Sequence, residues 1–202
     1  NYPAEAKGVY LDRAIYFAVQ DGSVHRLRED GKPLSLESAD ARILSFGASL
    51  AGPLQGSGDT LYAGLSNGDL VAWRVAFPLR KVWSVTFRTG VVRSPVVLGD
   101  NRVYAGVESA SGEMYALDAA TGREVWQRKL LPGPVSGPMV LIDEELVVPA
   151  GNDVVALSAA DGSVRWSTTL AGRVIGLAAR GRSFTASTAS GQIYCFRLGD
   201  RP

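Results

Sequence analysis

A short pattern that recurs at a nearly fixed interval constrains the fold of this chain more than any other feature. Each copy places a small residue, usually followed by proline, between β-forming residues. The copies are centred on Val9, Pro53, Pro95, Pro138 and Leu177; the first is weak and the last lacks the proline. The steps between these positions are 44, 42, 43 and 39 residues. The spacing predicts about five copies of one structural unit.

Each unit continues with the signals of three more strands. A second β-forming segment is followed by a tight turn such as Asn67-Gly68, whose residues tolerate the positive φ angles of a hairpin. A third, alternating strand then leads through a glycine turn to a strand that carries a tryptophan. Trp126 lies ten positions after Ala116, and Trp166 lies ten positions after Ala156. Four antiparallel strands per repeat of about forty residues predict a propeller blade, and hence an all-β fold.

We predict a single β-propeller domain over residues 1–202. The expected blades cover approximately residues 6–36, 48–84, 91–127, 134–167 and 173–202. The link between Leu36 and Phe46 is expected to be a longer loop. Two arrangements stay open. Five blades could close on themselves with an incomplete last outer strand, or the chain could be part of a seven- or eight-bladed ring. The larger parent is favoured, and its free edges would pair with a missing segment or a second chain.

The tryptophans and the glycine turns have a structural role in this prediction. A lone blade exposes both apolar faces, so neighbouring blades must stack, with the tryptophans between them. The aspartate of the turn can bond to backbone amides, and the glycines take the left-handed conformation. The residues assigned to this docking are Trp83, Trp126, Trp166, Asp118, Gly122 and Gly162.

The segment from Tyr115 to Gly122, followed by Trp126, resembles the tryptophan-docking repeat of PQQ-like (quinoprotein-type) β-propellers. That family includes quinoprotein alcohol dehydrogenases and the BamB-like propellers of outer-membrane assembly, to which this chain is closest in character. The likeness covers nearly the whole chain and is strongest from Pro95 to Trp166. It implies a propeller of about five PQQ-like, WD40-like repeats. Fold alone specifies function poorly.

The dehydrogenase branch of the family uses an adjacent pair of cysteines beside the quinone, a bound calcium and a catalytic aspartate. Cys195 is the only cysteine here, and no loop offers the six to eight oxygens that calcium prefers. We expect Asp143-Glu144-Glu145 to be a solvated turn, His25 to be structural and Cys195 to be a small packing residue. We therefore expect no enzyme activity, no cofactor and no metal site.

Several side chains are candidates for binding a partner. One hairpin, unlike the polar turns of the other blades, has an apolar tip flanked by cations. Its candidate residues are Phe77, Pro78, Leu79, Arg80 and Lys81. The alternative, in which Phe77 folds back onto its own blade, stays open. Arg93 is expected on an inner strand that faces the central channel.

Two stretches, residues 70–99 and 162–199, contain arginine or lysine but no acidic residue. They could bind a phosphate backbone, but no aromatic stacking platform accompanies them. The whole chain has 21 basic and 20 acidic residues, so no overall field attracts nucleic acid. Scattered surface arginines are the favoured interpretation.

The leading functional hypothesis is a non-catalytic scaffold of the bacterial periplasm or cell envelope. It would bind a protein partner or an extended polypeptide, as the resemblance to the BamB-like subunit implies. A ligand- or signal-sensing domain of a larger protein is the first alternative, and nucleic-acid binding is the second. No run of 18 apolar residues exists, so we expect no transmembrane segment in this chain.

Overall fold

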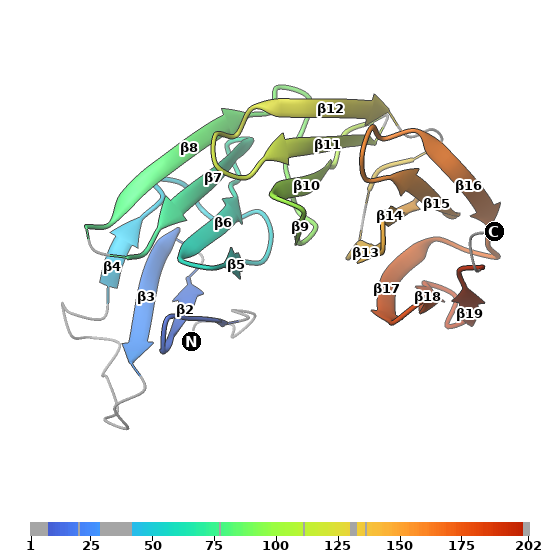
Figure 1. Ribbon diagram of the computed structural model, residues 1–202, viewed down its shortest axis with the longest axis horizontal. Helices are drawn as coiled ribbons and strands as arrows, with labels where there is room; N and C mark the ends of the chain where they lie inside the picture. Colours follow the sequence, from blue (N-terminus) through green and yellow to red (C-terminus); the bar gives the residue numbers. More distant parts are fainter. Residues whose placement is uncertain are drawn as a thin grey trace. The chain divides into compact units, whose positions relative to one another are not determined.

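The computed structural model describes residues 8–19, 21–28, 42–76, 78–110, 112–129, 133–135 and 137–199. These ranges contain strands and turns and no helix. The strands form five antiparallel sheets, in which strands that follow one another in sequence are paired (Figure 1). The all-β prediction and the repeated meander are thereby confirmed.

The chain divides into two compact units, Asn1–Val92 and Arg93–Pro202. The N-terminal unit contains two four-stranded sheets. The first sheet consists of β1 (Val9–Leu11), β2 (Ala14–Ala18), β3 (Ser23–Arg28) and β4 (Arg42–Ser45). The second consists of β5 (Gln55–Ser57), β6 (Thr60–Gly64), β7 (Asp69–Arg74) and β8 (Arg80–Thr86). One hydrophobic core joins them, with Leu11 and Tyr16 from the first sheet packed with Leu61 and Val71 from the second.

The C-terminal unit contains three sheets. The third sheet consists of β9 (Val97–Gly99), β10 (Arg102–Val107), β11 (Glu113–Asp118) and β12 (Glu124–Lys129). The fourth consists of β13 (Val140–Ile142), β14 (Glu145–Ala150), β15 (Asp153–Ser158) and β16 (Val164–Thr169). The fifth has β17 (Val174–Arg180), β18 (Ser183–Thr188) and β19 (Ile193–Arg197). One core lies between the third and fourth sheets and another between the fourth and fifth.

The first sheet extends further along the chain than expected. Strand β4 pairs with β3, with Val24 opposite Leu44, within the segment that was predicted to be a loop between Leu36 and Phe46. Residues 29–41 lie outside the described residues, so the prediction of a loop was wrong for residues 42–45. The fourth strands were located by their tryptophans, and β4 contains none. Leu44 packs against the core of the unit instead.

The proline segments precede the inner strands and do not form them. Strands β5, β9 and β13 have three residues each and begin just after Pro53, Pro95 and Pro138. Proline lacks the N–H that a strand ladder requires, so it interrupts the pairing. On the N-terminal side of the proline, isolated bridges such as that between Leu50 and Leu65 pair the chain with the next strand again. Strand β17, whose segment has no proline, has seven residues.

Candidate functional site

Three of the four tryptophans occupy equivalent positions in the second, third and fourth sheets. Each lies on the fourth strand, opposite an alanine of the third strand, and the register shifts directly after that pair. The pairs are Ala72 with Trp83, Ala116 with Trp126 and Ala156 with Trp166. A small residue under each indole ring leaves room for the ring to lie on the sheet.

Trp126 docks onto a turn of the following sheet. Its indole is 7% exposed, and Nε1 donates a hydrogen bond of 3.0 Å to the carbonyl oxygen of Ala159. The ring covers Gly162 so closely that a Cβ added there would lie 2.6 Å from Cε3 of the indole. Gly162 also has φ of +70°, a backbone conformation that favours glycine. Glycine at position 162 therefore meets both a backbone and a packing requirement.

The turn between the third and fourth strands is held by an aspartate in both sheets where it is clearest. Asp118 accepts bonds from the hydroxyl (2.7 Å) and the amide N–H (2.8 Å) of Thr121, and these bonds lower its pKa. In the fourth sheet, Asp161 accepts from the N–H and hydroxyl of Ser163, which lowers its pKa to about 2. Gly122 has φ of 71°, close to that of Gly162. Two different aspartate positions thus stabilise the same turn.

Trp166 and Trp83, at the equivalent positions of their sheets, have different neighbours. Trp166 is half-buried, and its Nε1 donates to Oε2 of Glu145 at 3.0 Å. Its ring stacks on Phe184 of the fifth sheet, with centroids 6.0 Å apart and planes at 19°. Trp83 is 7% exposed and lies tilted against Tyr62 of its own sheet.

The structure places most of the predicted partner-binding residues on one exposed segment. Pro78 and Leu79 precede β8, whose first residues are Arg80 and Lys81, and all four are exposed. Phe77 lies outside the described residues. Arg80 stands opposite Arg74, whose guanidinium pairs with Asp59 at 3.0 Å. The cationic side chains of this segment that remain exposed are therefore Arg80 and Lys81.

Arg93 does not belong to that segment and is not on an inner strand, so this part of the prediction was wrong. It lies two residues before Pro95, and β9 begins only after that proline. Its guanidinium pairs with the carboxylate of Glu108 at 2.5 Å. Both side chains are partly exposed. The ion pair satisfies the charge of Arg93 locally.

The fifth sheet has an outer strand that differs from all the others. Its order is β17-β18-β19, so within the described part of the chain β19 is an edge strand. Ile193 on this strand is 72% exposed. Cys195 is also exposed, which contradicts its expected role as a packing residue. The equivalent Ala156 is buried because it lies in the core between its own sheet and the following one, whereas Cys195 belongs to the fifth sheet and is exposed.

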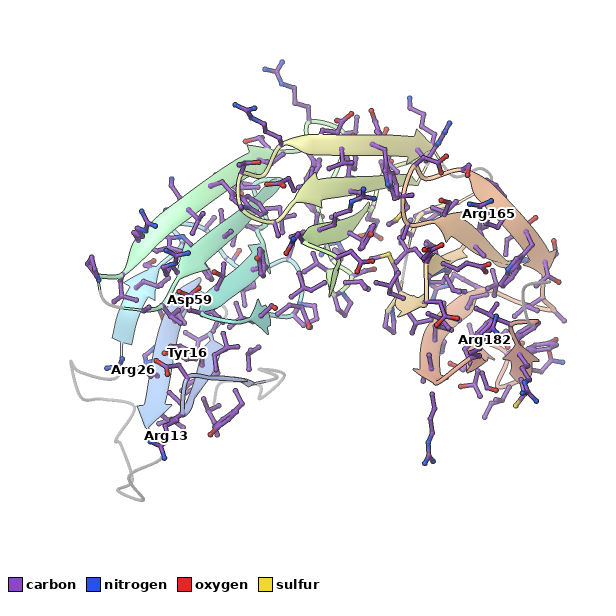
Figure 2. The ribbon with its side chains drawn as sticks, viewed as in Figure 1. Arg13, Tyr16, Arg26, Asp59, Arg165 and Arg182 are labelled. Carbon is purple, nitrogen blue, oxygen red and sulfur yellow. The ribbon has the colours of Figure 1, made fainter. Side chains whose placement is uncertain are left out.

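His25 and Arg182 make contacts within the fold. His25 is half-buried, stacks on Phe17 and has Nε2 3.2 Å from the hydroxyl of Ser23. Arg182, in the hairpin between β17 and β18, pairs with Asp143 at 3.2 Å; Figure 2 labels it together with Arg165 of β16.

Across the described ranges, no group of three or more His, Cys, Asp and Glu side chains could hold a metal ion. Nor do these ranges hold a helix with the length and hydropathy to cross a bilayer.

The family-model match and the curated relative point to the same protein family. The model of the family described as outer membrane protein assembly factor BamB matches residues 79–200, more than half of the chain. Outer membrane protein assembly factor BamB of Xanthomonas campestris pv. campestris is 32% identical over 123 residues. That match covers 53% of this chain and 29% of the relative, so the chain spans less than a third of its length.

Solved structures agree on the fold. BamB from Moraxella catarrhalis matches with a TM-score of 0.73 and 16% identity, over 96% of this chain and 58% of that one. A quinohemoprotein alcohol dehydrogenase from Pseudomonas putida matches with a TM-score of 0.68 and 17% identity, over 95% of this chain and 40% of that one. Identities this low show the fold alone, and the second match shows that an enzyme shares it. The fold is a β-propeller, and the chain belongs to the PQQ-like repeat family of outer membrane protein assembly factor BamB.

Proposed function

We propose that this chain is a non-catalytic, protein-binding part of an outer-membrane protein assembly factor of the bacterial cell envelope. The match of residues 79–200 to the BamB family carries the proposal. The polar groups of the described residues support it, because those that stand out, such as His25 and Arg182, are engaged in structural contacts. A rigid set of sheets with exposed hairpins is suited to holding a partner.

The segment Pro78–Lys81 is the surface proposed to contact that partner. Leu79 is 36% exposed and is followed by Arg80 and Lys81, both exposed. An apolar contact beside two cations suits a partner with an apolar residue near acidic ones.

A chimaera tests the assembly role. Residues 79–200 would replace the matching stretch of the Xanthomonas relative, in a strain that lacks its own BamB. We expect the chimaera to restore the level of folded outer-membrane β-barrel proteins, measured by their heat-modifiable migration in gels. The triple variant Leu79→Ser, Arg80→Glu, Lys81→Glu should restore less at equal expression. Failure of a chimaera that accumulates normally would contradict the proposal.

The salt dependence of binding distinguishes the nucleic-acid alternative from the protein-binding role. Binding through arginines to a phosphate backbone weakens steeply with salt concentration. We expect no binding of a labelled single-stranded oligonucleotide at about 50 mM salt, where such contacts are strong. Binding that disappears as salt is raised would favour the nucleic-acid function instead.

A further inference from the structure

One of the four tryptophans does not occupy a docking position. Trp73 lies on β7, directly after Ala72, whereas the other three lie on fourth strands. Its counterparts in the third and fourth sheets are Leu117 and Leu157, each directly after the alanine that faces a docking tryptophan. Both leucines are buried, with exposed fractions of 1% and 0%, whereas Trp73 is only half-buried. In the second sheet, a larger aromatic side chain therefore replaces leucine and reaches the surface.

The indole of Trp73 lies between the core and the solvent. The strand register places Leu61 of β6, Trp73 of β7 and Lys81 of β8 in one row across the second sheet (Figure 1). Residues opposite one another on neighbouring strands lie on the same face of a sheet. Leu61 is 0% exposed, Trp73 packs against the core shared by the first and second sheets, and Lys81 is exposed. The row therefore passes from the core to the solvent, with the indole at the boundary and a cation beside it.

The next row of the sheet carries an excess of positive charge. Arg74 and Arg80 stand opposite each other, and like charges in this arrangement repel. Asp59 pairs with the guanidinium of Arg74 at 3.0 Å and so offsets one of the two charges. Among the described residues, no carboxylate forms an ion pair with Arg80 or Lys81. These two residues are consecutive on β8, so their side chains point to opposite faces of the strand.

We propose that Trp73 anchors the partner at the Pro78–Lys81 surface, and that the partner supplies an extended acidic segment with an aromatic residue. The aromatic ring packs on the exposed part of the Trp73 indole, and carboxylates on either side of the ring meet Lys81 and Arg80. Charge complementarity selects an acidic segment, because the one carboxylate paired in this row, that of Asp59, is already engaged with an arginine. The inference deepens the proposed function and rests on it in taking this surface as the contact with a protein.

The other sheets supply a variant that removes the anchor and keeps the fold. Trp73→Leu introduces the residue that the third and fourth sheets have at this position, so we expect unfolding to remain cooperative. The probe is a fluorescein-labelled peptide with the sequence Gly-Glu-Asp-Phe-Asp-Glu-Gly. Its binding to the 202-residue chain is followed by fluorescence anisotropy. Trp73→Leu should weaken this binding on the order of ten-fold, because large aromatic side chains dominate binding energies.

The two cations are compared with an exposed arginine elsewhere. Lys81→Ala and Arg80→Ala should each weaken binding about three-fold at low salt, and this loss should shrink as salt screens the charges. Arg123→Ala is the matched control, because Arg123 is exposed directly before the fourth strand of the third sheet. This control variant should bind the peptide as the unsubstituted chain does.

A double-mutant cycle distinguishes direct contact with the indole from an indirect effect. The second peptide has serine in place of phenylalanine, and it should bind the unsubstituted chain on the order of ten-fold less tightly. If the phenylalanine ring packs on Trp73, the same change in the peptide should cost little further affinity in Trp73→Leu. A purely structural role of Trp73 would leave the two losses additive.

Fluorescence quenching by iodide tests whether the indole is accessible. The emission that is present in the unsubstituted chain and absent from Trp73→Leu belongs to this indole. We expect iodide to quench it in the free chain, and bound peptide to protect it.

Additive losses in the cycle would overturn the inference, and so would the absence of peptide binding up to about 1 mM. Shielding of Trp73 from iodide in the free chain would also overturn it, because the chain would then cover its own indole. Binding of phosphatidylglycerol vesicles or of a single-stranded oligonucleotide, without binding of the peptide, would overturn it in favour of a lipid or a nucleic acid.

These outcomes are independent of the chimaera, which contains residues 79–200 and therefore not Trp73. Peptide binding through Trp73 with a failed chimaera would retain the surface and reject the assembly role. A chimaera that restores assembly, with no peptide binding, would reject the anchor and retain the role.

Discussion

The fourth and fifth sheets have the same arrangement of their first three strands, but within the described residues only the fourth sheet has a fourth strand. Ala156 and Cys195 occupy the same position on the third strand of their sheets, yet Ala156 is 0% exposed and Cys195 is exposed. On β15, every residue from Val154 to Ser158 is buried, whereas β19 alternates between exposed and half-buried residues. The difference teaches that burial in this repeat depends on the neighbouring sheet, because Ala156 lies in the core between the fourth and fifth sheets, whereas Cys195 lies between Tyr194 and Phe196, which pack against that core, and is itself exposed.

Removal of the best-docked tryptophan should give the largest effect. Trp126→Ala removes a buried ring and the bond to Ala159, and should cost about 3 to 5 kcal/mol of unfolding free energy. Trp166→Ala is the comparison, and should cost less because that ring is half-buried. Urea unfolding followed by circular dichroism measures both. Equal losses would mean that the third sheet docks onto the fourth no more tightly than the fourth onto the fifth.

Substitution of two glycines with similar backbone angles distinguishes the energetic cost of backbone strain from that of side-chain packing. Gly162 (φ +70°) lies under Trp126, whereas Gly191 (φ +83°) has nothing within 4 Å of an added Cβ. Gly191→Ala should cost about 1 to 2 kcal/mol for the backbone alone. Gly162→Ala should cost roughly 1 kcal/mol more, because the ring of Trp126 must move. If the two variants unfold at the same urea concentration, the contact with the ring carries no energetic weight.

The paired positions on the third strands should respond differently to a larger side chain. Ala156→Leu overfills the space under Trp166 and should cost about 1 to 3 kcal/mol. Cys195→Leu should change stability by less than about 0.5 kcal/mol, as an exposed substitution does. Thermal unfolding of the two variants makes the comparison. A large loss for Cys195→Leu would show that the position is covered in solution.

Acidification should have the smallest effect on stability, and we expect it to act through Asp161 in the turn between β15 and β16 of the fourth sheet. The pKa of Asp161 is lowered to about 2 by bonds from Ser163, so its stabilising contribution is complete above its ordinary pKa near 4 and is lost as pH falls towards 2. The carboxyl chemical shift, followed by NMR, should titrate near 2. Ser163→Ala should return the pKa towards its ordinary value. A normal pKa in the unsubstituted chain would mean that the turn is open.

Local signals made the repeats predictable. Turn glycines, tryptophan spacing and strand alternation are all encoded within about forty residues, so the sheets and the pairs Ala116–Trp126 and Ala156–Trp166 could be expected. Strand β4 was missed because Leu44 replaces the aromatic marker. The exposure of Cys195 could not be read from β19 itself, because burial at this position depends on packing against a neighbouring sheet, as Ala156 shows. Proline positions were recognised, but their effect on where pairing starts was not.

The contact of Trp126 with the turn at Ala159–Gly162 gives the fourth sheet two joints, one with each neighbouring sheet. The turn receives the indole of the preceding repeat, and the same sheet offers its own Trp166 to Phe184 of the next. A gene duplication or deletion of one whole repeat of this kind would leave these two joints with partners, whereas a boundary inside the repeat would separate the turn from the indole ring that the same sheet offers to the next. Growth of such a chain by complete cassettes follows from where one indole ring lies.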